Sequence, residues 1–78
     1  MDKWLYYDID LFMKVLLNNK STFLDDGLTI ESLLNQIDMK QKYFAVEVNE
    51  QIVPKSNYDI FLIKEGDKIE IVTAIGGG

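Results

Sequence analysis

The sequence predicts a single α+β domain, in which a mixed sheet of four to five strands carries one main helix across one face. Two observations predict this class. Short segments rich in β-forming residues lie before and after a single segment with helical periodicity. The chain of 78 residues also suffices for one domain and not for two, and 47% of its residues are apolar, which is enough for a core.

The first predicted element is a β-hairpin. Residues 13–17 (MKVLL) are mostly apolar, the pair Asn18-Asn19 is typical of a turn, and residues 20–24 (KSTFL) resume the β pattern. The turn-forming residues 25–27 (DDG) end the second strand.

A helix is predicted next, over about residues 30–39. Its apolar residues recur at helical spacing: Ile30, Leu33, Leu34 and Ile37. Thr29 is the predicted N-cap, and Leu28 precedes it at the position that packs against Leu33 in a hydrophobic staple.

Three further segments complete the predicted sheet. Residues 43–49 (YFAVEVN) are dense in β-formers, and residues 52–53 make a short piece that Pro54 ends, which favours a strand at an edge. Residues 55–67 are irregular by period, and the last strand is predicted over residues 69–74 (IEIVTA).

A hairpin followed by a helix and further strands is the α+β arrangement called β-grasp, which is the ubiquitin-like fold. The side chains predicted to face the core are those of Val15, Leu17, Phe23, Ile30, Leu33, Leu34, Ile37, Ala45, Val46, Ile69 and Ile71. Tyr58 and Phe61 are expected to cover an end of this core.

Composition excludes most kinds of active site. The chain has no histidine and no cysteine, so the usual general base, the usual nucleophilic pairs and the commonest metal ligands are missing. We therefore predict no catalytic residue, no bound metal and no bound cofactor. The net charge of -5 disfavours nucleic acid as a partner, and no apolar run reaches the roughly 20 residues that span a membrane. The absence of cysteine and of a secretory signal favours the cytoplasm.

Residues 1–12 do not continue the pattern of the domain predicted at 13–78. They are rich in aromatic residues and aspartate, and three interpretations stay open: an additional edge strand, an apolar self-association patch, or a misassigned start, since Met13 would itself serve as one.

The chain ends in three glycines, Gly76, Gly77 and Gly78, directly after the last predicted strand. Glycine offers a tail no side chain to pack, so a structural role is hard to assign. A backbone without side chains is instead thin enough to enter a narrow channel, which would bring the Gly78 carboxylate to a nucleotide held by an enzyme. A frayed terminus without a function is the alternative interpretation.

The stretches FAVEVNEQIVPKSNYD (44–59) and KEGDKIEIVTAIGGG (64–78), and more loosely LTIESLLNQI (28–37), resemble the ThiS family of thiamine-biosynthesis sulfur carriers. The resemblance covers residues 13–78 and leaves residues 1–12 outside it. It implies that a ThiF-like, E1-like adenylyltransferase uses ATP to adenylate Gly78. The product then becomes a thiocarboxylate, with sulfur from a donor such as a cysteine desulfurase, and a ThiG-like thiazole synthase uses that sulfur.

The resemblance implies that Gly76 and Gly77 thread into the ThiF-like enzyme. Val72, Ala74 and Ile75 are expected to lie beside the tail and are candidates for docking. Simple packing is the alternative role for these three residues.

Three other functions stay open at this point. The small subunit of molybdopterin synthase shares the fold and a glycine end, but its tail usually carries prolines that residues 73–75 lack. A ubiquitin-like modifier would attach Gly78 to lysines of other proteins. A noncatalytic interaction module would make no use of the tail.

Overall fold

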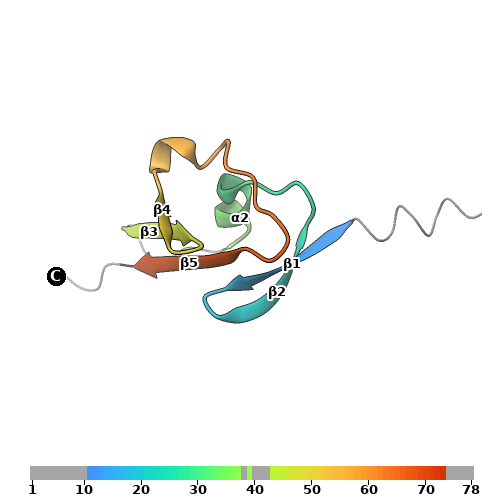
Figure 1. Cartoon of the computed structure of the whole chain (residues 1–78). Coiled ribbons are helices and arrows are strands. Elements are labelled where there is room, and N and C mark those ends of the chain that lie inside the picture. The colour runs from blue at the N-terminus through green and yellow to red at the C-terminus, as the bar shows by residue number, and fades with distance from the viewer. Residues whose placement is uncertain (1–10, 38, 40–42, 74–78) are drawn as a thin grey trace, which may run out of the picture.

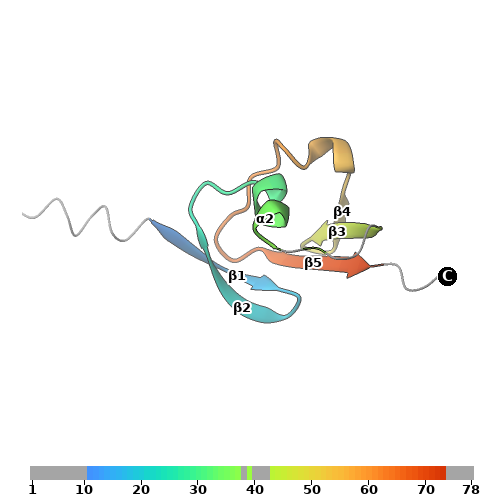
Figure 2. The same ribbon diagram turned by 180° about the vertical axis from the view of Figure 1, so that it is seen from behind.

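A computed structural model describes residues 11–37, 39 and 43–73. These residues form a five-stranded sheet with the strand order β2-β1-β5-β3-β4. The strands are β1 (Phe12–Leu17), β2 (Lys20–Asp25), β3 (Phe44–Val48), β4 (Gln51–Val53) and β5 (Lys68–Thr73), and helix α2 spans Ile30–Gln36. Only β1 and β5 pair in parallel, which makes the sheet mixed as predicted. Figures 1 and 2 show α2 lying on one side of this sheet.

The predicted hairpin is confirmed. Met13 pairs with Leu24 and Leu17 with Lys20 across a two-residue turn. Asn18 and Asn19 have φ values of 50° and 68°, the left-handed conformation that a type I′ turn requires and that asparagine tolerates. Strand β1 begins at Phe12, which pairs with Asp25, one residue before the predicted domain start.

The helix begins as predicted and ends earlier. The Thr29 hydroxyl accepts a hydrogen bond from the Ser32 N–H at 3.1 Å, which makes Thr29 the N-cap. Ile37 has an extended backbone, so the helix ends at Gln36 and the prediction that it continues to residue 39 is wrong. The apolar periodicity extends to Ile37 because this side chain still packs against the core after the helical backbone has ended.

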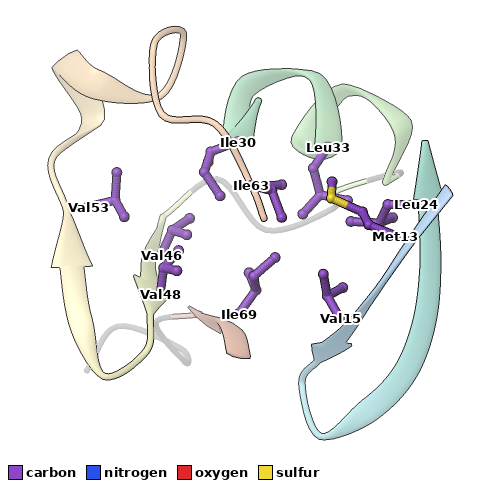
Figure 3. Close-up of a cluster of buried hydrophobic side chains, with 10 residues drawn as sticks. All are labelled: Met13, Val15, Leu24, Ile30, Leu33, Val46, Val48, Val53, Ile63 and Ile69. Carbon is purple, nitrogen blue, oxygen red and sulfur yellow. The ribbon is translucent and has the colours of Figure 1, made fainter. Parts of the chain in front are cut away.

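The core lies between α2 and one face of the sheet (Figure 3). Its buried side chains are those of Met13, Val15, Leu24, Ile30, Leu33, Val46, Val48, Val53, Ile63 and Ile69. Five predicted core residues are among them: Val15, Ile30, Leu33, Val46 and Ile69. Leu17, Leu34, Ile37 and Ile71 are partly buried against this cluster, and so are Tyr58 and Phe61, which were expected to cover its end.

Two of the predicted core residues do not face the core. Phe23 is 70% exposed, and its neighbour Leu24 is buried instead. Ala45 is half-buried, while Val46 beside it is buried. Successive side chains of a strand point to opposite faces, so each of these pairs can place only one member inward.

The segment between β4 and β5 closes one end of the core. It contains a 3₁₀ helix at Lys55–Asn57, and Pro54 precedes it at the end of edge strand β4, as predicted. The Tyr58 ring stacks on Phe44 of β3, with centroids 6.4 Å apart. Ile63 is buried, and its N–H donates to the Leu28 carbonyl at 2.9 Å, which ties this segment to the start of α2.

Candidate functional site

Strand β5 precedes the glycine tail in the sequence, so the contacts that fix β5 also fix the point from which the tail starts. The strand lies between β1 and β3, with Ile69 beside Leu17 on one side and Thr73 beside Phe44 on the other. Gly76, Gly77 and Gly78, with Ala74 and Ile75, lie outside the described residues, and the roles predicted for them stay predictions.

Val72 is the predicted docking residue that the structure describes. Its side chain is 50% exposed, and it lies next to Ala45 of β3. Because Ile71 before it faces the core, Val72 points to the opposite face of the sheet, which α2 does not cover. Ile69 and Ile71 of the same strand point to the opposite face and pack in or against the core. The position of Val72 is thus available to a partner, while its role in docking stays a prediction.

Carboxylates flank Val72 on this uncovered face. Ile52 of β4, Glu47 of β3 and Glu70 of β5 form the neighbouring row across three strands. Ile52 is 68% exposed, and Glu70 lies 3.4 Å from the Lys68 ammonium. Since Lys68 pairs with one of these carboxylates, the surface beside Val72 carries charges of both signs.

Two turn asparagines bind the backbone of β5, one at its first residue and one two residues before its last, a role that the sequence pattern did not predict. Asn18 Oδ1 accepts a hydrogen bond from the Ile71 N–H at 2.8 Å, and Asn49 Oδ1 accepts one from the Lys68 N–H at 3.0 Å. Both asparagines have φ near 50°, the left-handed conformation that asparagine tolerates. Their long-range hydrogen bonds depend on the register of β1, β3 and β5, and the sequence pattern does not predict that register.

The described residues contain no group of three or more possible metal ligands. A groove of about 710 Å³ lies between β4 and the segment after it, lined by residues that include Ile52, Ile60, Leu62 and Asp67. Its lining ends at Asp67, the residue before β5, and Thr73 at the far end of that strand does not line it. No helix within the described ranges is long and apolar enough to cross a membrane.

Within the described ranges, a mixed sheet in the order β2-β1-β5-β3-β4 with one α-helix across it defines a ubiquitin-like β-grasp domain, and in the sequence the tail follows its central strand. The model of the ThiS family matches residues 13–78. The chain therefore belongs to the ThiS family.

Individual relatives agree with this assignment. The chain is 33% identical to the sulfur carrier protein ThiS of Escherichia coli over 66 residues, which are 85% of this chain and 100% of that protein. The crystal structure of the thiamine biosynthesis protein ThiS from Geobacter metallireducens superimposes with a TM-score of 0.74 at 29% identity, covering 85% of this chain and 100% of the other. The chain is thus a homologue of a sulfur carrier of thiamine biosynthesis.

A third relative is much longer than this chain. The thiazole synthase of Paramagnetospirillum magneticum is 41% identical over 66 residues, but the chain spans only 20% of its length. A ThiS-like segment is therefore one part of a larger protein that is named for thiazole synthesis.

Proposed function

We propose that this chain is a sulfur carrier protein of thiamine biosynthesis and that the Gly78 carboxylate carries the sulfur. An E1-like, ThiF-like enzyme would adenylate this carboxylate with ATP. A thiazole synthase would then take the sulfur from the resulting thiocarboxylate. In this role the chain is a protein substrate of its partners and not an enzyme.

The observation that carries the proposal is the match of residues 13–78 to a sulfur carrier over that protein's entire length. Similarity to part of a thiazole synthase supports thiamine as the pathway and the synthase as the partner. This similarity favours a carrier of thiamine biosynthesis over a molybdopterin synthase subunit, because a thiazole synthase would make the thiazole of thiamine.

The chemistry needs little from this chain beyond a thin, accessible end. An oxygen of the Gly78 carboxylate attacks the α-phosphorus of ATP, and pyrophosphate leaves. Hydrosulfide then attacks the acyl carbon, AMP leaves, and a C–S bond replaces the C–O bond to AMP. If the persulfide of a cysteine desulfurase is the donor, its terminal sulfur attacks and AMP leaves in the same way, and a thiol must then reduce the resulting acyl disulfide to release the thiocarboxylate. The partner supplies the nucleotide site, since this chain has no Gly-rich phosphate loop between a strand and a helix. The reducing, ATP-containing cytoplasm is the compartment that this cycle requires.

Recognition by the partner would use the surface around the end of β5. Val72 is exposed there, and Ala74 and Ile75 follow it in the sequence. Docking of these residues would hold the domain while Gly76 and Gly77 enter the channel of the enzyme.

Intact mass spectrometry tests the proposal directly. After incubation with ATP, the E1-like enzyme and sulfide, the chain should gain the mass difference between one sulfur and one oxygen atom. Omitting ATP should abolish the gain, because the free carboxylate is a poor electrophile. An unchanged mass with an enzyme that is active on its own carrier would refute the sulfur-carrier function.

Substitution Gly77→Val separates the tail from the fold. Residues beyond the last strand seldom contribute to packing, so the free energy of unfolding should change by less than about 0.5 kcal/mol. In the enzyme the new side chain would displace the carboxylate from the α-phosphorus, and a shift of about 1 Å costs on the order of a hundredfold in rate. Gly77→Ala should give a milder loss. Thiocarboxylation of Gly77→Val at the wild-type rate would show that the tail is not threaded.

A further inference from the structure

The turn between β1 and β2 adds a hydrogen bond to β5 after β1 itself has ended. Pairing of β1 with β5 ends with Leu17 beside Ile69. The next residue, Asn18, donates its backbone N–H to the Ile69 carbonyl at 2.8 Å, and its side-chain Oδ1 accepts from the Ile71 N–H at 2.8 Å. In a regular parallel ladder a backbone carbonyl would accept this second bond. The Asn18 side chain takes its place, because the turn at φ 50° redirects the backbone.

The turn alone does not explain asparagine at this position. A left-handed φ is met equally well by glycine, which is common in two-residue hairpin turns. Glycine would leave the Ile71 N–H without the oxygen that Asn18 supplies. The side chain therefore serves β5 and not the hairpin.

This hydrogen bond lies on the side of β5 that would otherwise be open near the tail. On the other side, β3 pairs with β5 as far as Thr73. On the β1 side, the bond to Asn18 is the last hydrogen bond of the β5 backbone among the described residues, two residues before the strand ends.

We propose that Asn18 is a positioning residue for the tail: its amide oxygen holds Ile71 so that the chain leaves the sheet at a defined point and in a defined direction. The inference rests on the proposed function and adds a residue to it. A tail that starts from a fixed point loses less conformational freedom on entering the enzyme, so it binds at a lower concentration.

Asn49 provides a matched control at the opposite end of the same strand. It too occupies a left-handed turn position, with φ 53°, and its Oδ1 accepts from the Lys68 N–H at the start of β5. Asn49→Gly and Asn18→Gly thus each remove a turn asparagine that holds a β5 amide, and both keep the turn conformation accessible. Only Asn18 lies at the end from which the tail leaves.

The experiment compares wild type, Asn18→Gly, Asn49→Gly and Asn18→Asp in adenylation by the E1-like enzyme, well below all melting temperatures. For Asn18→Gly we expect the KM for this chain as substrate to rise about fivefold with kcat little changed. The variant lacks the hydrogen bond that positions the tail before binding, which is a loss of about 1 kcal/mol. Asn49→Gly should keep KM within about twofold, although both variants melt earlier. Asn18→Asp should restore KM, since its carboxylate also accepts a hydrogen bond.

Amide hydrogen exchange adds a measurement that needs no partner. The Ile71 N–H should exchange at least about tenfold faster in Asn18→Gly than in wild type, and not in Asn49→Gly. Equal KM values for wild type and Asn18→Gly, or equal increases in the two glycine variants, would overturn the positioning role. A wild-type chain that is not adenylated at all would overturn the proposed function, and this inference with it.

Discussion

The two faces of the sheet differ in how far their apolar side chains are buried. On the inner face, Val15, Val46 and Ile69 are almost completely buried beneath α2. On the outer face, Phe23 and Val72 are at least half exposed, because each follows or precedes a residue of its strand that faces the core. Strand β5 contributes to both faces, because Ile69 points to the inner face and Val72 to the outer one.

We expect this difference in burial to separate residues needed for stability from residues available for recognition. Burying an aliphatic side chain contributes about 1.5–3 kcal/mol, so the inner residues hold the fold. An exposed residue contributes far less to stability and remains available for contact with another protein. Substitutions on the two faces should therefore have opposite consequences.

The largest expected effect comes from Leu24→Thr, compared with Phe23→Thr. Leu24 is 7% exposed and Phe23 is 70% exposed, and they are neighbours in β2. Threonine favours strands at both positions, so strand propensity does not distinguish the variants. Leu24→Thr leaves a cavity and buries a hydroxyl, and it should destabilise by about 3 kcal/mol, whereas Phe23→Thr should change stability by less than about 0.5 kcal/mol. Chemical denaturation measures both.

The reverse order would place Phe23 inside, as its hydrophobicity had predicted from the sequence. That outcome would shift the register of β2 by one residue. Comparable losses in both variants would mean that another part of the protein or a second copy covers the outer face.

Local chemistry made much of the fold predictable. The pair Asn18-Asn19 marks its turn because asparagine tolerates a left-handed backbone. Thr29 marks the helix start because its hydroxyl satisfies a free N–H, and Pro54 marks the end of an edge strand because it cannot donate to a neighbouring strand. Each of these signals acts within a few residues, so a sequence reveals it without tertiary information.

The errors arose where tertiary packing decides. In FL at 23–24 and AV at 45–46, both neighbours suit a core, and only the register of the sheet selects one of them. Ile63 is buried although it lies in an irregular segment, because that segment folds back onto the start of α2. Hydrophobic periodicity cannot report a contact that a loop makes.

The candidate site was predictable in a different way. The tail glycines, Gly76 to Gly78, were recognised from resemblance and chemistry, and they lie outside the described residues. Val72 was singled out by its place next to the tail, and the structure adds that its side chain is exposed. The hydrogen bond from Ile71 to Asn18 joins residues 53 positions apart, so no local pattern could indicate it.

The smallest expected change in stability, Val72→Thr, tests recognition by the outer face. Threonine has nearly the shape of valine and the same preference for strands, and at a half-exposed position its hydroxyl remains solvated, so the free energy of unfolding should change by less than about 0.5 kcal/mol. If a partner covers residue 72, the threonine hydroxyl loses its bound water and meets a surface that evolved to contact valine and offers it no hydrogen-bond acceptor, which costs about 1–3 kcal/mol. The KM for adenylation should then rise about tenfold while the melting curve stays in place. Phe23→Thr is the matched control, because it also replaces an exposed apolar residue by threonine but lies on β2, separated from β5 by β1. A KM that responds to Phe23→Thr and not to Val72→Thr would move the docking surface away from the tail and to the other edge of the sheet.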